Sequence, residues 1–264
     1  MDALQNKQEL TAQLSMQRTL CARGYQLLSD LWLSFSPEGP KTRQIFDRKY
    51  MAAWRTFHDF DPVSVKVLVD IGAHDGLYAK YAAQYFSLER TILIEPLPEK
   101  AEILHDLNVP GKVVIMAALA DRVGTAQFTI NSTQQASSIK RVNTNLGAEY
   151  GLDFTEKNVI TVNLTTLDAV LDDLSLERVD LVKIDAQGAE RELLLGSRRS
   201  LPRIRFLQIE MLFADHYADA ADFCELYQML RTAGFRLAML KDFTHGPTGT
   251  LLQCDGVFMN KCWL

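Results

Sequence analysis

The sequence predicts an α/β protein built on a mostly parallel sheet. From about residue 65 onward, short apolar runs alternate with segments whose apolar residues recur at helical spacing. Four of the runs stop directly at a carboxylate, and the last two strands follow each other without a helix between them. A strand that returns without a crossover helix runs antiparallel to its neighbour, so the final strand is expected to be antiparallel.

Residues 1 to 60 precede the first core strand, and their pattern is helical. An apolar stripe is formed by Leu14, Cys21, Tyr25, Leu28, Trp32 and Phe35. We favour a helix that packs on its own domain. The alternative is a dimer-forming helix and hence a homodimer, because the spacing approaches a heptad seam. The predicted organisation is a helical extension over residues 1–60 and one α/β domain over residues 61–264.

The α/β elements follow in order along the chain. The predicted strands lie at 65–70, 91–95, 113–117, 125–130, 159–164, 179–184, 204–209, 235–240 and 256–259, and the predicted helices at 77–86, 98–107, 167–174, 189–195 and 220–233. Pro98 suits the first turn of its helix, and Gly196 and Gly234 suit helix ends. Polar and apolar residues alternate over 125–130, which is typical of an edge or hairpin strand. The polar stretch 131–158 is the predicted substrate loop.

The composition excludes several classes of function. The chain has 264 residues, 47% of them hydrophobic, with a net charge of −5, which argues against a nucleic-acid partner. The four cysteines have neither metal-ligand nor redox spacing, so we expect a reduced, cytoplasmic protein. The first residues do not resemble a signal peptide, and no apolar run is long enough to span a membrane.

Carboxylates follow four of the predicted core strands. They are Asp70, Glu95, Asp185 and Glu210. Ligands in open α/β sheets bind beyond the carboxyl ends of the strands, so these four residues predict the position of the site. For any one of them alone, a helix cap is an equally ordinary role.

The turn after the first strand favours one cofactor over another. Its pattern is Asp70-x-Gly72-x-x-x-Gly76, whereas dinucleotide sites have G-x-G-x-x-G so that a pyrophosphate reaches the helix N-terminus. A carboxylate at the turn repels pyrophosphate and suits the cationic S-adenosylmethionine. Glu95, one strand–helix–strand unit later, can accept hydrogen bonds from both ribose hydroxyls. An NAD or nucleotide enzyme on the same fold stays as a less favoured alternative.

The order of motifs resembles the FkbM type of class I S-adenosylmethionine-dependent methyltransferases. The residues concerned are Val69 to Gly76, Ile94-Glu95-Pro96, Ala117 to Asp121, Ser137-Ser138, Thr165 to Asp168, Lys183 to Glu190, and Ile209-Glu210. The resemblance covers about residues 65–260 and implies a Rossmann-like, seven-stranded fold. It also implies methyl transfer to a hydroxyl of a small-molecule acceptor, such as a sugar, a polyketide or another secondary metabolite.

The resemblance also implies roles for individual residues. Asp70, Gly72 and Gly76 would hold the methionine end of the cofactor, Glu95 the ribose and Ala118 the adenine, while Asp185 would lie beside the methyl group and the acceptor. One position departs from the family, which commonly has Glu where this chain has Gln187. That departure leaves open an alternative in which the chain binds the cofactor without catalysis.

Two residues are candidates for the catalytic base. Our hypothesis is that Asp185 orients or deprotonates the acceptor hydroxyl, with His216 as the competing base. His74 lies in the cofactor turn and is expected to contact ligand rather than act as a base. Lys183 lies two residues before Asp185 and on the same side of the strand, so an ion pair is expected. No metal site is predicted, although Asp185 and Glu210 offer oxygen ligands.

Overall fold

The structure is a computed structural model that describes residues 57, 60–61, 64–133, 136–143 and 154–263. The chain divides into one unit from Met1 to Ala52 and another from Ala53 to Leu264. The expected N-terminal helices, and with them the helix considered for dimerisation, lie almost entirely outside the described residues. So does much of the predicted polar loop, namely 134–135 and 144–153.

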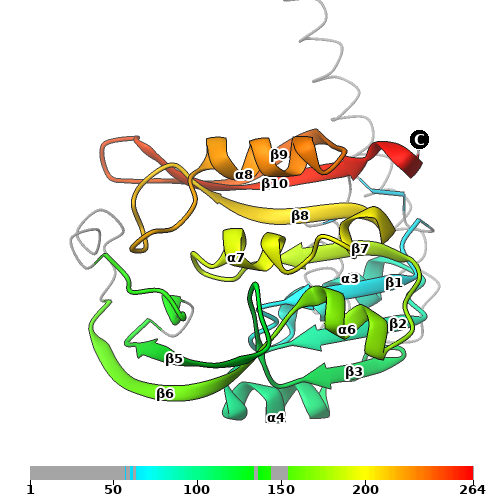
Figure 1. The fold of residues 1–264 in the computed structure, drawn as a ribbon, viewed down its shortest axis with the longest axis horizontal. Helices are drawn as coiled ribbons and strands as arrows, with labels where there is room; N and C mark the ends of the chain where they lie inside the picture. The colour runs from blue at the N-terminus through cyan, green and yellow to red at the C-terminus, as the bar shows by residue number, and fades with distance from the viewer. Residues whose placement is uncertain (1–56, 58–59, 62–63, 134–135, 144–153, 264) are drawn as a thin grey trace, which may run out of the picture. The chain divides into compact units, whose positions relative to one another are not determined.

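A seven-stranded sheet forms the centre of the fold, in the order β3-β2-β1-β7-β8-β10-β9 (Figure 1). Its strands are β1 (Val67–Ile71), β2 (Arg90–Ile94), β3 (Lys112–Ile115), β7 (Val179–Ile184), β8 (Ile204–Leu212), β9 (Phe235–His245) and β10 (Leu251–Asn260). Neighbours from β3 to β8 pair in parallel, whereas β10 runs antiparallel to both β8 and β9. The predicted fold class, including its antiparallel final strand, is confirmed.

Helices cover both faces of this sheet. One face packs against α6 (Leu167–Asp173), α7 (Glu190–Leu195) and α8 (Phe223–Thr232), and the other against α3 (Leu77–Tyr85) and α4 (Pro98–Asp106). In Figure 1, α6 and α7 lie in front of the sheet and α3 lies behind it. Along β1, Val69 and Ile71 enter the first core while Leu68 enters the second. A strand buried on both faces needs such an unbroken apolar run, which explains the valine-rich sequence.

A second, three-stranded sheet lies apart from the main one, in the order β4-β6-β5. Its strands are β4 (Ala118–Leu119), β5 (Gly124–Asn131) and β6 (Glu156–Thr165). Of the two characters predicted for 125–130, the edge strand is confirmed, since β5 lies at the edge of this sheet and pairs antiparallel with β6. The predicted end of the polar loop at residue 158 is wrong, because β6 already begins at Glu156 and pairs there with Asn131. In Figure 1 this sheet extends beyond the ends of β2 and β3.

Membrane insertion through a helix has no support in the part of the chain that the structure describes. None of the helices in the described ranges combines the length and the apolar character needed to cross a bilayer.

Candidate functional site

The turn after β1 is shaped by close contact with the end of β7. Gly72 has φ +73°, and a Cβ atom there would lie only 2.0 Å from the backbone oxygen of Asp185. Glycine is therefore required both by the left-handed backbone and by the space. Gly72 and Ala73 donate backbone hydrogen bonds to the Ile94 oxygen at 3.0 and 3.1 Å, which fixes the turn against β2. The turn thus joins the carboxyl ends of three strands.

Two residues of the predicted cofactor motif lie beneath the turn rather than in a cavity. Asp70 is fully buried, and its Oδ1 lies 3.7 Å from the Nζ atom of Lys183. Burial raises the pKa of Asp70, and the charge of Lys183 opposes that rise. Gly76 has φ +74° and packs against the side chains of Leu104 and Leu107 of the α4 region. Both residues therefore support the shape of the turn from inside the protein.

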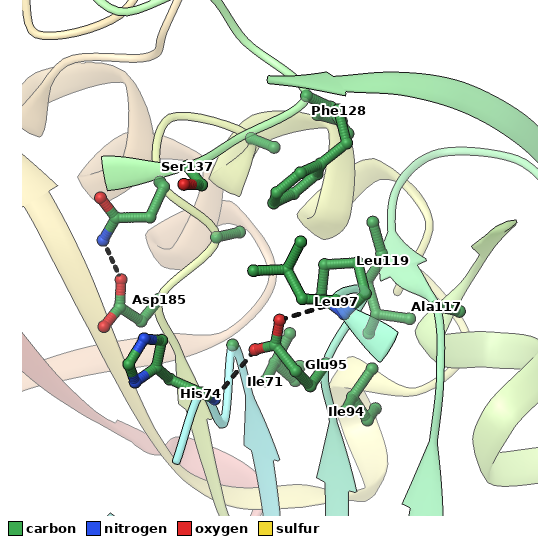
Figure 2. Close-up of a pocket in the computed structure, with 17 residues that line it drawn as sticks. Ile71, His74, Ile94, Glu95, Leu97, Ala117, Leu119, Phe128, Ser137 and Asp185 are labelled. Carbon is green, nitrogen blue, oxygen red and sulfur yellow. Dashed lines mark hydrogen bonds between the residues drawn. The ribbon is translucent and has the colours of Figure 1, made fainter. Parts of the chain in front are cut away.

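A cavity opens at the edge where β1, β2 and β7 end (Figure 2). It brings together five of the residues singled out in the sequence, namely Gly72, His74, Glu95, Ala118 and Asp185. Open α/β sheets bind ligands at this edge, so the cavity lies where the strand-end carboxylates predict it. The structure does not bring Asp70, Gly76 or His216 to its lining.

Glu95 is held rigidly at one end of the cavity. Its Oε2 accepts a hydrogen bond from the backbone N–H of His74 at 2.9 Å, and its Oε1 accepts one from that of Leu97 at 3.0 Å (Figure 2). The side chain is only 4% exposed, and this burial raises the pKa of Glu95, while the two N–H groups oppose the rise. Each oxygen retains a lone pair for a ligand hydroxyl.

Asp185 lies at the other side of the cavity and is fixed by two donors. Lys183 Nζ lies 3.1 Å from Asp185 Oδ2, and the side-chain amide of Gln187 donates to Oδ1. The ion pair predicted from the strand spacing is therefore present. Burial alone would lower the pKa of Lys183, but the carboxylates of Asp185 and Asp70 outweigh it and raise that pKa. Lys183 therefore stays protonated, and its positive charge compensates the negative charges of Asp70 and Asp185.

The apolar wall of the cavity comes from segments that the sequence did not connect to it. Phe128 on β5 faces the cavity together with Leu97, Leu119 and Ile139 (Figure 2). Phe128 also packs in a small core with Leu97 and Val162. The alternation over 125–130 places Phe128 on one face of its strand, but only the pairing of the second sheet shows where that face points.

Ser137 and Ser138 differ in their placement. Ser137 lines the cavity, whereas Ser138 is buried and its hydroxyl donates to the backbone oxygen of Gln187 at 2.6 Å. The hydrogen bond of Ser138 supports the turn after β7.

His216 lies in the loop after β8, outside the cavity lining. Its Nδ1 atom lies 2.6 Å from the Ala214 oxygen, and its own backbone oxygen accepts from the N–H of Asn143 at 2.7 Å. The side chain is 7% exposed. These contacts place His216 in the packing between two loops.

Metal chemistry has no evident site in the described ranges. There, no three His, Cys, Asp or Glu side chains are arranged to hold a metal ion.

Comparisons with known proteins point to one family. The model of the Methyltransferase FkbM domain matches residues 70–237. The chain is 26% identical over 153 residues to the 2-O-methyltransferase NoeI of Sinorhizobium fredii (strain NBRC 101917 / NGR234), covering 54% of this chain and 62% of that protein. It is 27% identical over 153 residues to methyltransferase sdnD of Sordaria araneosa, covering 49% of this chain and 59% of that one.

A longer match involves a much larger protein. The chain is 28% identical over 206 residues to the AMB antimetabolite synthetase AmbE of Pseudomonas aeruginosa PAO1, covering 67% of this chain but only 10% of that protein. The chain thus spans less than two thirds of each of these relatives. Among solved structures, methyltransferase FkbM from Methylobacillus flagellatus KT aligns with a TM-score of 0.49 and 16% identity, covering 80% of this chain and 47% of that one.

Proposed function

Because the chain belongs to the FkbM methyltransferase family, we propose that its cavity binds S-adenosylmethionine and that the protein methylates a hydroxyl of a small-molecule acceptor. The observation that supports this most directly is the pairing of Glu95 and Asp185 in one cavity, joined by the glycine turn. Two carboxylates beside an apolar wall suit an adenosyl ligand that carries positive charge. The same acids disfavour a pyrophosphate.

The residues present fit this cofactor at each of its parts. The buried Glu95 carboxylate is placed to accept hydrogen bonds from ribose hydroxyls, and Phe128, Leu97 and Ala118 offer an apolar slot for the adenine. The Gly72 turn and the side of the cavity at Asp185 would hold the methionine end of the cofactor. Asp70 contributes from below by fixing Lys183 rather than by direct contact.

Asp185 is the proposed base for the acceptor. When bound, S-adenosylmethionine supplies an electrophilic methyl group whose carbon–sulfur electron pair stays with the departing thioether. The acceptor oxygen forms the new bond to carbon, and Asp185 takes or orients the hydroxyl proton. Lys183 and Gln187 hold one Asp185 oxygen each, which fixes the carboxylate relative to the cavity. Alignment and exclusion of water are the main contributions that such a site makes.

The acceptor class is the finer part of the proposal. NoeI is described as a 2-O-methyltransferase, which supports a hydroxyl acceptor for this chain as well. A mass-spectrometric screen for a gain of one methyl group across sugar and polyketide hydroxyls tests it. A product methylated only on nitrogen or carbon would overturn the assignment to oxygen.

Titration calorimetry tests the cofactor. We expect the wild-type chain to bind S-adenosylmethionine and not NAD, and Glu95→Gln to lose about tenfold or more in affinity, because each Glu95 oxygen accepts one backbone N–H and the amide would turn its NH2 group toward one of them. Asp180→Asn is a control away from the cavity, where one oxygen, Asp180 Oδ2, accepts from the backbone N–H groups of both Lys66 and Val67 at 2.9 Å each. Asp180 begins β7 at the far end from the cavity, so this variant should bind normally.

Three results would contradict the proposal or a part of it. Wild-type protein that binds NAD but not S-adenosylmethionine would favour the nucleotide enzyme. Equal losses of affinity in Glu95→Gln and Asp180→Asn would show that Glu95 acts only through the fold. Tight cofactor binding without methyl transfer to any screened acceptor would favour the non-catalytic binding module.

A further inference from the structure

Gln187 holds an unusual backbone conformation at the edge of the cavity. Its φ is +52°, in the left-handed region that a residue with a Cβ atom enters at a cost of about 1 kcal/mol. The Ser138 hydroxyl donates to its backbone oxygen at 2.6 Å, and Gly188 follows with φ +93°. A Cβ atom on Gly188 would lie 2.6 Å from the Tyr217 ring, so that ring packs directly on the turn. The surroundings therefore impose this conformation.

The side chain of Gln187 connects three other residues. Its amide nitrogen donates to Asp185 Oδ1 and lies 3.4 Å from Glu210 Oε2, while its Oε1 accepts from the Tyr217 hydroxyl. The two carboxylates orient the amide, because the flipped amide would point its oxygen at them. The Tyr217 hydroxyl donates to the Oε1 atom at the other end and thus holds the amide in place against Asp185.

A carboxyl at position 187 could not make these contacts without a proton. Buried Glu210 already has a raised pKa, caused first by burial and then by the charges of Asp185 and Glu190. Other charged groups near Asp185 are Lys183 on β7, Asp70 on β1, His74 in the following turn and Asp255 on β10. One more acid between Asp185 and Glu210 would have to share a proton with them, as close carboxyl pairs do.

A second glutamine in the structure makes the same arrangement away from the cavity. Gln208 on β8 donates to Asp255 Oδ2 at 2.5 Å and accepts from the Tyr78 hydroxyl at 2.9 Å. It is 3% exposed and does not line the cavity. The Tyr78–Gln208–Asp255 chain therefore matches the Tyr217–Gln187–Asp185 chain in chemistry but not in position.

We propose that Gln187 is a positioning residue whose amide, held in place by Tyr217, holds Asp185 toward the bound cofactor without adding a further carboxyl to the pair formed by Asp185 and Glu210. This inference rests on the proposed function, since it concerns the same cavity. Gln187 touches Asp185 rather than the reacting atoms.

Calorimetry with S-adenosylmethionine and with S-adenosylhomocysteine, which lacks the sulfonium charge, tests the inference without an acceptor. In Gln187→Glu, the preference for the sulfonium ligand should rise with pH by about fivefold more than in wild type, because loss of the shared carboxyl proton adds a negative charge near the sulfonium. Gln208→Glu places its carboxyl against Asp255 and across the sheet from Lys183 rather than against Asp185, so its pH dependence should be smaller than that of Gln187→Glu. Far-UV circular dichroism checks that each variant is folded.

Tyr217→Phe gives a second measurement that leaves Gln187 in place. Removing the hydroxyl takes away the donor to Gln187 Oε1, so the amide holds Asp185 less firmly and affinity for S-adenosylmethionine should fall by about threefold or more, while Tyr78→Phe keeps it. Gln187→Glu and Gln208→Glu with the same pH dependence, or Tyr217→Phe with wild-type affinity, would overturn the inference. Wild-type protein that fails to bind S-adenosylmethionine at any pH would instead refute the proposed function.

Discussion

Glu190, the first residue of α7, is a buried carboxyl whose ionisation opposes folding. It is 1% exposed, its Oε1 accepts from the Ala186 N–H at 2.9 Å, and burial raises its pKa to about 7 from an ordinary value of 4.5. Below pH 4.5 both the folded and the unfolded chain hold the proton. Between about pH 4.5 and about pH 7 only the folded chain holds it, so stability from this group falls as the pH rises through that window.

Glu190→Gln should remove that pH dependence. The amide oxygen can still accept from Ala186, but the side chain no longer titrates. We expect the variant to be more stable than wild type by up to about 3 kcal/mol at pH 7, with a difference that vanishes near pH 4. Urea denaturation at a series of pH values measures this. A constant difference between the two proteins from pH 4 to 7 would contradict it.

At the scale of single residues, the sequence predicted which side chains carry the chemistry better than it predicted where each of them lies. Glu95 and Asp185 were expected to face a ligand, and both line the cavity. Asp70 ends its strand in the same way, yet it lies underneath, because it pairs with Leu93 and Lys183 within the sheet, two residues before the level of Glu95 and Asp185. Lys183 compensates its charge there. The position of His216 was not predictable because it depends on the path of the loop after β8. That loop is held by the hydrogen bond from the Asn143 N–H to the His216 oxygen, and Asn143 lies far away in the sequence.

Among the elements, the second sheet decides the shape of the cavity. Phe128 lies on β5 and contributes both to the cavity wall and to a small core with Val162. Val162 lies in that same core but is not part of the cavity lining. Variants at these two residues therefore distinguish the loss of a ligand contact from the loss of core packing alone.

Phe128→Ala and Val162→Ala should therefore differ in binding. Both remove buried apolar volume and should lower the free energy of unfolding, by about 3 and about 1–2 kcal/mol. Only Phe128→Ala should weaken S-adenosylmethionine binding, by about tenfold or more, because an aromatic ring in contact with adenine is lost. Calorimetry and urea denaturation of both variants measure this. Equal affinities in the two variants would show that β5 does not touch the cofactor.

The elements themselves were largely predictable. The apolar runs and helical periods specified the main-sheet strands, and the family resemblance is confirmed by the match over residues 70–237. The separation of β5 and β6 into their own sheet was not predictable, because it depends on β6 pairing with the two-residue β4 at Ala118 and Leu119. A pair that short leaves almost no pattern in a sequence.

For the whole molecule, we propose that the α/β domain begins before residue 61. We predicted that the domain starts at residue 61. The structure places Phe57, fully buried, and Phe60 in the core with α3, with the Phe57 ring 4.9 Å from that of Phe86 and 5.0 Å from that of Tyr78. The unit that contains them begins at Ala53. A domain cut at residue 61 would lose both rings.

Two truncated chains should therefore behave differently. We expect residues 53–264 to unfold in one cooperative transition and to bind S-adenosylmethionine as the full chain does. Residues 61–264 should lose about 3–5 kcal/mol or fail to fold, because removing the Phe57 ring alone leaves a large cavity against Phe86 and Tyr78. Phe57→Ala in the full chain isolates that contribution from any effect of shortening the chain. Equal stability of the two truncated proteins would place the boundary at residue 61 after all, and would show that the two rings cover the core without stabilising it.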